Sequence, residues 1–104
     1  MRLYLSGPIT NNPNYRRVFR EAQSILESMG QNDIVNPANL CEVLNPEVYG
    51  YENIMVLCKD LLATCDAVVL LPGWEKSHGC GREVGYAEAM DLLVVEFEDY
   101  VRGR

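Results

Sequence analysis

Glu83 is the residue whose type and position point most directly to chemistry. It follows two glycines, Gly79 and Gly81, and we expect it in the opening turn of a helix over residues 82–90. The positive end of a helix dipole favours an ionised carboxylate, which can attack an electrophilic sugar carbon as a nucleophile. The alternative is that an acidic residue in a first turn only stabilises its own helix.

Two segments rich in glycine, proline and serine form a second group of candidates. Gly7 and Pro8 end a first apolar run, and Ser77 opens the segment that leads to Glu83. Glycine lets a backbone approach a ligand closely, and hydroxyl and N–H groups can bind an anion. Neither segment matches the dinucleotide fingerprint or the Walker loop, and both can also be ordinary strand-to-helix turns.

Aromatic and thiol side chains near these segments give weaker indications. Tyr4 and Trp74 could stack on a base or sugar, although Tyr4 could equally be a core residue. His78 lies near Cys80, but no third group is placed to orient a nucleophilic pair. The four cysteines form no C-x-x-C pair and there is a single histidine, so we expect no metal and no other cofactor. Buried free thiols in a reducing cytoplasm are the simplest interpretation.

Apolar runs of strand length alternate with helical patterns along the whole chain. Strands are predicted over 3–6, 33–36, 66–71 and 92–97, and helices between Asn14 and Gly30, over about 54–65, and over 82–90. Residues 38–50 read as an irregular loop with one helical turn. This alternation predicts an α/β fold: one Rossmann-like or flavodoxin-like domain over residues 1–104, with a parallel sheet in the order 2-1-3-4 and helices on both faces.

In such sheets, ligands bind at the carboxyl ends of the strands, where the strand order switches. Here the switch lies between the first and third strands. It selects residues 6–11 and 72–81, which are also the segments richest in glycine, proline, serine and asparagine. Two independent arguments therefore predict a ligand site at the same edge.

Charge and length exclude several classes of function. The chain is 48% hydrophobic and has 9 basic and 15 acidic residues, a net charge of −6. That balance argues against binding a nucleic-acid polymer or an anionic membrane surface. No apolar run reaches the roughly 18 residues of a membrane span, and the first residues do not resemble a signal peptide, so we expect a cytoplasmic location.

Three stretches give the chain a family resemblance. Residues 4–10 (YLSGPIT), 65–77 (CDAVVLLPGWEKS) with Gly79, and 83–87 (EVGYA) occur in this order. The chain resembles the nucleoside deoxyribosyltransferase-like superfamily, most closely its small bacterial and phage branch of unknown function. The resemblance implies a Rossmann-like sheet and cleavage or transfer at an N-glycosidic bond without a metal.

The resemblance also implies roles for individual residues. Glu83 would be the nucleophile that attacks C1′ and expels the base, and Ser77 and Gly79 would face a 5′-hydroxyl or 5′-phosphate. The residues that would line the base and sugar side are Tyr4, Ser6, Gly7, Pro8 and Ile9.

One position departs from the pattern of active relatives. They carry an acidic residue about two turns before the aspartate of the third strand, and it helps to protonate the departing base. Counting back from Asp66, that position holds Cys58. Asp60 is the nearest acid and is retained as a candidate, but two helix residues correspond to a rotation of about 200°.

These observations leave two function classes. The first is an enzyme, most simply a hydrolase of deoxynucleoside 5′-monophosphates, with a transferase as a variant. The second is a nucleotide-binding module without turnover, such as a sensor. A flavodoxin-like electron carrier ranks last, because the segment after the first strand lacks a serine- and threonine-rich phosphate loop. A homo-oligomer formed through the Tyr49–Tyr51 segment is a further expectation.

Overall fold

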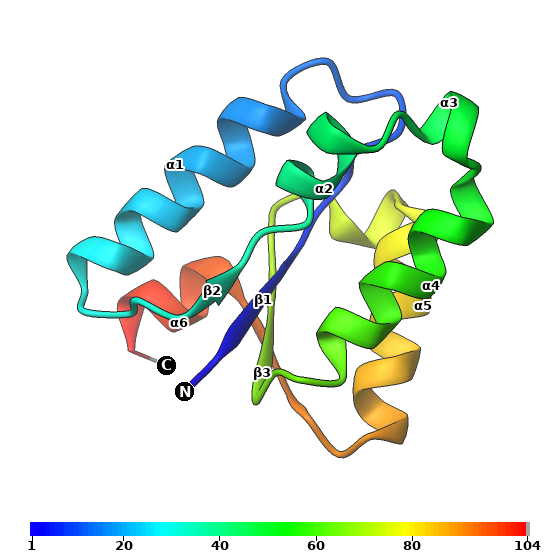
Figure 1. The fold of residues 1–104 in the computed structure, drawn as a ribbon. Helices are drawn as coiled ribbons and strands as arrows, with labels where there is room; N and C mark the ends of the chain where they lie inside the picture. Colours follow the sequence, from blue (N-terminus) through cyan, green and yellow to red (C-terminus); the bar gives the residue numbers. More distant parts are fainter. Residues whose placement is uncertain (104) are drawn as a thin grey trace.

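The computed structural model describes residues 1–103 as a four-stranded parallel sheet with helices on both faces (Figure 1). The strand order is β2-β1-β3-β4, which confirms the predicted α/β class and topology. In chain order the elements are β1 (Leu3–Ser6), α1 (Tyr15–Ser28), β2 (Ile34–Val35), α2 (Ala38–Val43), α3 (Pro46–Tyr49), α4 (Tyr51–Leu62), β3 (Ala67–Leu70), the 3₁₀ turn η1 (Trp74–Lys76), α5 (His78–Ala89), β4 (Leu93–Glu96) and α6 (Phe97–Arg102).

The two central strands, β1 and β3, are buried along their whole length. Leu3 pairs with Ala67 and Ser6 pairs with Leu70, so the two strands end at the same edge of the sheet. A strand buried on both faces needs apolar residues at nearly every position. Ser6 is the exception, and its polar side chain therefore requires a partner inside the protein.

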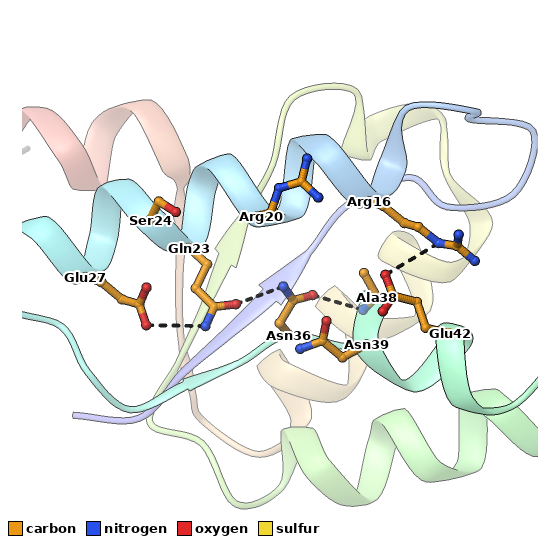
Figure 2. Close-up of a pocket in the computed structure, with 9 residues that line it drawn as sticks. All are labelled: Arg16, Arg20, Gln23, Ser24, Glu27, Asn36, Ala38, Asn39 and Glu42. Carbon is orange, nitrogen blue, oxygen red and sulfur yellow. Dashed lines mark hydrogen bonds and ion pairs between the residues drawn. The ribbon is translucent and has the colours of Figure 1, made fainter.

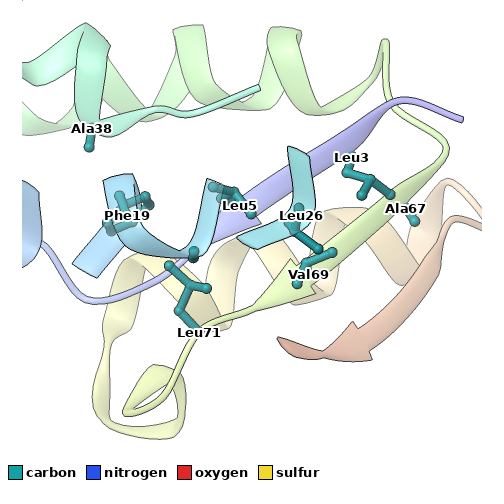
Figure 3. Packing of buried hydrophobic residues seen from close by; sticks show 9 residues of the cluster. Leu3, Leu5, Phe19, Leu26, Ala38, Ala67, Val69 and Leu71 are labelled. Carbon is teal, nitrogen blue, oxygen red and sulfur yellow. The ribbon is translucent and has the colours of Figure 1, made fainter. Parts of the chain in front are cut away.

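Alternation of side chains along the strands divides the core into two layers. Leu3 and Leu5 face α1 and α6, where they pack with Phe19 and Leu26 of α1 (Figure 3). Tyr4 points to the opposite face, which is covered by α4 and α5 (Figure 1). Because side chains two apart on a strand share a face, Ser6 also points toward the α4 and α5 side.

Phe19 anchors α1 in the first of these layers and is 1% exposed. We expect Phe19→Ala to lower the free energy of unfolding by about 3–5 kcal/mol, because it removes a buried ring and leaves a cavity. Urea unfolding followed by circular dichroism measures this loss. Arg20→Ala is the matched control: the neighbouring side chain is exposed, and its loss should change stability by less than about 0.5 kcal/mol. Equal losses in both variants would contradict the assignment of Phe19 to the core.

The segment predicted as an irregular loop is instead two short helices, α2 and α3. Each begins at an Asn-Pro pair. The side chain of Asn36 accepts a hydrogen bond from the Ala38 N–H at 3.0 Å, and that of Asn45 accepts one from the Glu47 N–H at 3.0 Å. These caps satisfy N–H groups that have no partner within the helix. Helices this short have little periodicity, which explains why the prediction was wrong here.

Two further boundaries differ from the sequence prediction. Helix α5 begins at His78 rather than Arg82, because the Ser77 side chain accepts a hydrogen bond from the Cys80 N–H at 3.3 Å and caps the helix. The chain also continues beyond β4 into α6, which was not predicted. Phe97 and Tyr100 of this six-residue helix lie three apart and pack on the α1 layer. None of the helices within residues 1–103 is long and apolar enough to cross a membrane.

Candidate active site

Glu83 lies in the second turn of α5 with its side chain turned toward the sheet. It is 6% exposed, and Ser6 is fully buried. Among residues 1–103, Ser6 and Glu83 are the two polar or charged residues that are buried. The polar pair therefore sits in the α4 and α5 layer, close to the carboxyl end of β1.

Both carboxylate oxygens of Glu83 accept hydrogen bonds from β1. The Tyr4 hydroxyl donates to Oε2, and the Ser6 hydroxyl donates to Oε1 at 2.8 Å. Tyr4 and Ser6 are two apart on one strand, so their side chains point to the same face and reach the same carboxylate. Two donors fixed on a buried strand hold the carboxylate in a defined orientation.

Burial raises the pKa of Glu83, and the hydrogen bonds from Tyr4 and Ser6 lower it without cancelling the effect. This corrects the expectation that a first-turn position would favour the ionised form. The helix starts earlier than predicted, so Glu83 is one turn farther from the helix N-terminus, and removal from water dominates. Loss of hydration makes a carboxylate more reactive as a nucleophile than it is in water, and the two hydrogen bonds fix its orientation.

Thiols complete the surroundings of Glu83. Cys58 is buried in the same core layer as Tyr4, and burial raises the pKa of its thiol to about 11. Cys80 is buried three residues before Glu83 on α5, and burial raises the pKa of its thiol as well. Cys41 is also buried, and burial, together with the nearby Glu83 charge, raises the pKa of its thiol. From the sequence, these cysteines were expected only to be core residues. Ile54 and Cys58 are four apart on one helix face, and this spacing was the signal that could have placed Cys58 in the core layer of Tyr4.

Asp60 does not join this group. It lies two residues beyond Cys58 on α4 and its side chain is exposed, whereas Cys58 is buried. The rotation of about 200° between the two positions accounts for the difference. His78 is likewise exposed, at the first position of α5. The structure therefore brings Tyr4, Ser6 and Glu83 together and leaves Asp60 on the outer side of α4.

The remaining candidate residues lie along the carboxyl edge of the sheet. Gly7 is buried, and a Cβ added there would meet Leu71 at 3.0 Å and the Phe19 ring at 3.1 Å, so its small size serves packing. Pro8 and Ile9 follow it and are half-buried.

The other side of this edge is formed by η1 and the start of α5. Trp74 is half-buried, and its indole N–H donates to Glu96 Oε1 at 3.3 Å. Ser77 caps α5, and Gly79 lies in the first turn of that helix. A Cβ at Gly79 would lie 3.4 Å from the Tyr51 hydroxyl, so the start of α4 borders this part of the edge. Sequence reasoning did not place Tyr51 here.

Tyr4→Phe tests the hydrogen bond that orients Glu83. Removing the hydroxyl deletes a donor to the carboxylate, so the pKa of Glu83 should rise further. Carboxyl ¹³C chemical shifts followed across a pH titration measure this pKa. Tyr100→Phe, on the opposite face of the sheet, is the control and should leave it unchanged. An unaltered Glu83 titration in Tyr4→Phe would show that the hydroxyl does not hold the carboxylate in solution.

Two surface hollows occur elsewhere on the molecule. The first, of about 310 Å³, lies between α1 and α2, and Figure 2 shows Arg16 paired with Glu42 and Gln23 bonded to Asn36 across it. The second, of about 280 Å³, lies beyond the carboxyl ends of β3 and β4, and its acidic residues are Glu75, Glu96, Glu98 and Asp99. Glu83 lines neither hollow. No group of three or more His, Cys, Asp or Glu side chains in residues 1–103 is arranged to hold a metal ion.

Comparison with known families gives one match. Residues 1–96 match the family described as a domain of unknown function, DUF4406. The chain belongs to this family. The matched range contains Tyr4, Ser6, Cys58 and Glu83, so the buried cluster lies within the family domain. No curated protein and no solved structure matches the chain. The family description names no activity.

Proposed function

We propose that this protein cleaves the N-glycosidic bond of a nucleoside or nucleoside 5′-monophosphate, with Glu83 as the nucleophile. The observation that carries the proposal is the Glu83 carboxylate, buried at the carboxyl end of the central strand and held on both oxygens by Tyr4 and Ser6. A fixed and poorly hydrated carboxylate suits attack on a sugar carbon. Membership of the nucleoside deoxyribosyltransferase-like superfamily is part of this proposal, supported by the motifs that contain these residues.

The reaction proceeds in two steps. A Glu83 oxygen attacks C1′ of the sugar, the C1′–N bond breaks, and a glycosyl ester forms on Glu83. Water then attacks C1′ and releases the free sugar, or a second base attacks and forms a new nucleoside. Tyr4 and Ser6 orient the carboxylate in both steps. Pro8 and Ile9 on one side and Trp74 on the other border the base and sugar, while Ser77 and Gly79 face the 5′-group.

A second candidate is a nucleotide-binding module without turnover. Two features favour it: Glu83 is only 6% exposed, and both of its oxygens already have hydrogen-bond donors within the chain. In that case Glu83 would fix β1 against α5, and the binding edge would recognise a nucleotide without reacting.

A substrate panel distinguishes the two candidates. Purified protein is incubated with deoxynucleosides, ribonucleosides and their 5′-monophosphates, and free base is followed by chromatography. Thermal shifts are measured with the same compounds. Base release supports the enzyme and identifies its substrate. Thermal shifts without base release from any compound support the binding module. Neither signal would contradict both candidates.

A further inference from the structure

The two side chains that donate hydrogen bonds to Glu83, the hydroxyls of Tyr4 and Ser6, are neutral. The thiols of Cys58 and Cys80, buried on the neighbouring stretches of α4 and α5, are also uncharged groups. Burial raises the pKa of the Tyr4 hydroxyl as well as those of the thiols. These groups keep their protons at neutral pH, so they can orient a carboxylate but are poor acids.

The other acidic side chains of α4 and of the segment before β3 are directed elsewhere. Glu52, in the first turn of α4, is exposed and pairs with Arg82 at 3.0 Å. Asp60 is exposed on the outer side of α4. Asp66 lies just before β3, at the amino end of the sheet, where its carboxylate accepts a hydrogen bond from the Arg2 backbone N–H at 2.6 Å. Glu83 is thus the one buried carboxylate within residues 1–103, and the function proposed above already assigns it the role of nucleophile.

This arrangement matters because ordinary purines and pyrimidines leave as anions unless they are protonated. A positioned general acid contributes about 10²–10⁴-fold to such a step. A leaving group that is already positively charged needs no proton, because it departs as a neutral ring. The neutral surroundings of Glu83 therefore favour a charged leaving group over an ordinary base.

Resting on the function proposed above, we propose that the preferred substrate is an N-glycoside of a quaternised heteroaromatic ring, of the pyridinium class. Such a ring carries a positive charge at the nitrogen that joins C1′. The ionised Glu83 complements that charge before attack. The half-buried Trp74 ring, on the same edge of the sheet, offers a face that attracts cations.

Acidic side chains also lie beside Trp74, in a hollow that Glu83 itself does not line. Four of them line this hollow beyond β3 and β4: Glu75, Glu96, Glu98, which pairs with Arg102 at 4.0 Å, and Asp99. Glu96 accepts the hydrogen bond from the Trp74 indole, so the acidic hollow and the candidate stacking residue adjoin each other. A concentration of negative charge favours the approach of a cationic ring.

The proposed reaction balances without a general acid or a cofactor. Glu83 attacks C1′, and the electron pair of the C1′–N bond passes to the ring nitrogen, which loses its positive charge. Water then attacks C1′, the ester bond returns its electron pair to Glu83, and one proton is released to solvent. The net reaction converts a pyridinium glycoside and water into a neutral pyridine, a free sugar and a proton.

The test compares leaving groups on the same sugar. The probes are nicotinamide mononucleotide, nicotinamide riboside and their 2′-deoxy counterparts, each matched with the cytosine and adenine compounds that have the same sugar and phosphate. We expect kcat/KM to be at least about 100-fold higher for the pyridinium member of each pair. We also expect no loss of activity on the alkaline side between pH 6 and 9, because no acid must remain protonated.

Failure of this inference is distinguishable from failure of the proposed function. Faster cleavage of cytosine or adenine compounds, with activity falling at alkaline pH, would overturn the pyridinium proposal and leave the N-glycosidase intact. Absence of cleavage for every probe would overturn both. Pyridinium cleavage that persists in Glu83→Gln would overturn the assigned nucleophile and with it both proposals.

Cys58→Asp provides a second, independent test. It places a carboxyl group beside Tyr4, where it can serve as a general acid, so the pyridinium preference should shrink by about 10-fold or more. Circular dichroism checks that the variant folds. A folded variant with unchanged preference would contradict the role assigned to the neutral surroundings. Should the variant not fold, the leaving-group comparison in the unaltered protein decides the question.

Discussion

Glu83→Gln should abolish turnover while the protein remains folded. Glutamine has nearly the shape of glutamate, and its carbonyl oxygen can still accept a hydrogen bond from β1, but an amide cannot form the glycosyl ester. We expect kcat/KM for the best substrate to fall by at least about 10³-fold, as is common when a nucleophile is removed. Chromatographic detection of the released base measures this loss, and circular dichroism verifies the fold.

Glu88→Gln is the matched control for this substitution. Glu88 belongs to the same helix, but its side chain is exposed. The same chemical change should therefore leave turnover within about twofold of the unaltered protein. Comparable losses in both variants would point to a general effect of charge, and full activity in Glu83→Gln would remove Glu83 from the mechanism.

Although Glu83→Gln should abolish turnover, it should increase the free energy of unfolding near neutral pH. Burial raises the pKa of Glu83 above its value in the unfolded chain, so the folded state holds the proton more tightly. This group favours folding most below the unfolded pKa of about 4.5, and that contribution is lost as pH rises through the higher folded pKa. Glutamine lacks this dependence. Glu83→Gln should consequently become more stable than the unaltered protein as pH rises toward 7.

Urea unfolding at a series of pH values between 4 and 8 measures this trend. The difference in free energy of unfolding between Glu83→Gln and the unaltered protein should grow with pH, and Glu88→Gln should show no such growth. A difference that stays constant with pH would show that the pKa of Glu83 does not change on folding. A difference that increasingly favours the unaltered protein toward pH 7 would show that Glu83 stabilises the fold as an ionised side chain. That outcome would favour a structural role over a catalytic one.

The strand and helix pattern could be predicted because its signals are local and strong. Ala67 to Leu70 has an apolar residue at every position, as a central parallel strand requires, and Gly30 ends α1 with the positive φ of 92° expected after a helix. Helix α6 escaped prediction because six residues carry too little periodicity. It depends on the packing of Phe97 and Tyr100 against α1, which is tertiary information.

The candidate site could be predicted in part. The strand order predicted which edge of the sheet would hold the site. The position of Glu83 after the glycine segment, together with the family resemblance, predicted that this residue belongs to the site. The pairing of Tyr4 and Ser6 with Glu83 depends on the rotation of α5, which the Ser77 cap sets and which the misplaced helix start obscured. The direction of the Glu83 pKa shift depends on burial, which no single residue type reveals.

Covalent trapping of the glycosyl ester would identify the nucleophile itself. The protein is incubated with 2′-deoxy-2′-fluoro analogues of its best substrates, which slow the second step more than the first, and is then digested for mass spectrometry. We expect a mass increase of one fluorinated sugar residue on the peptide that contains Glu83, and no such increase in Glu83→Gln. Base release with no sugar attached to the protein, or a sugar attached elsewhere, would contradict Glu83 as the nucleophile.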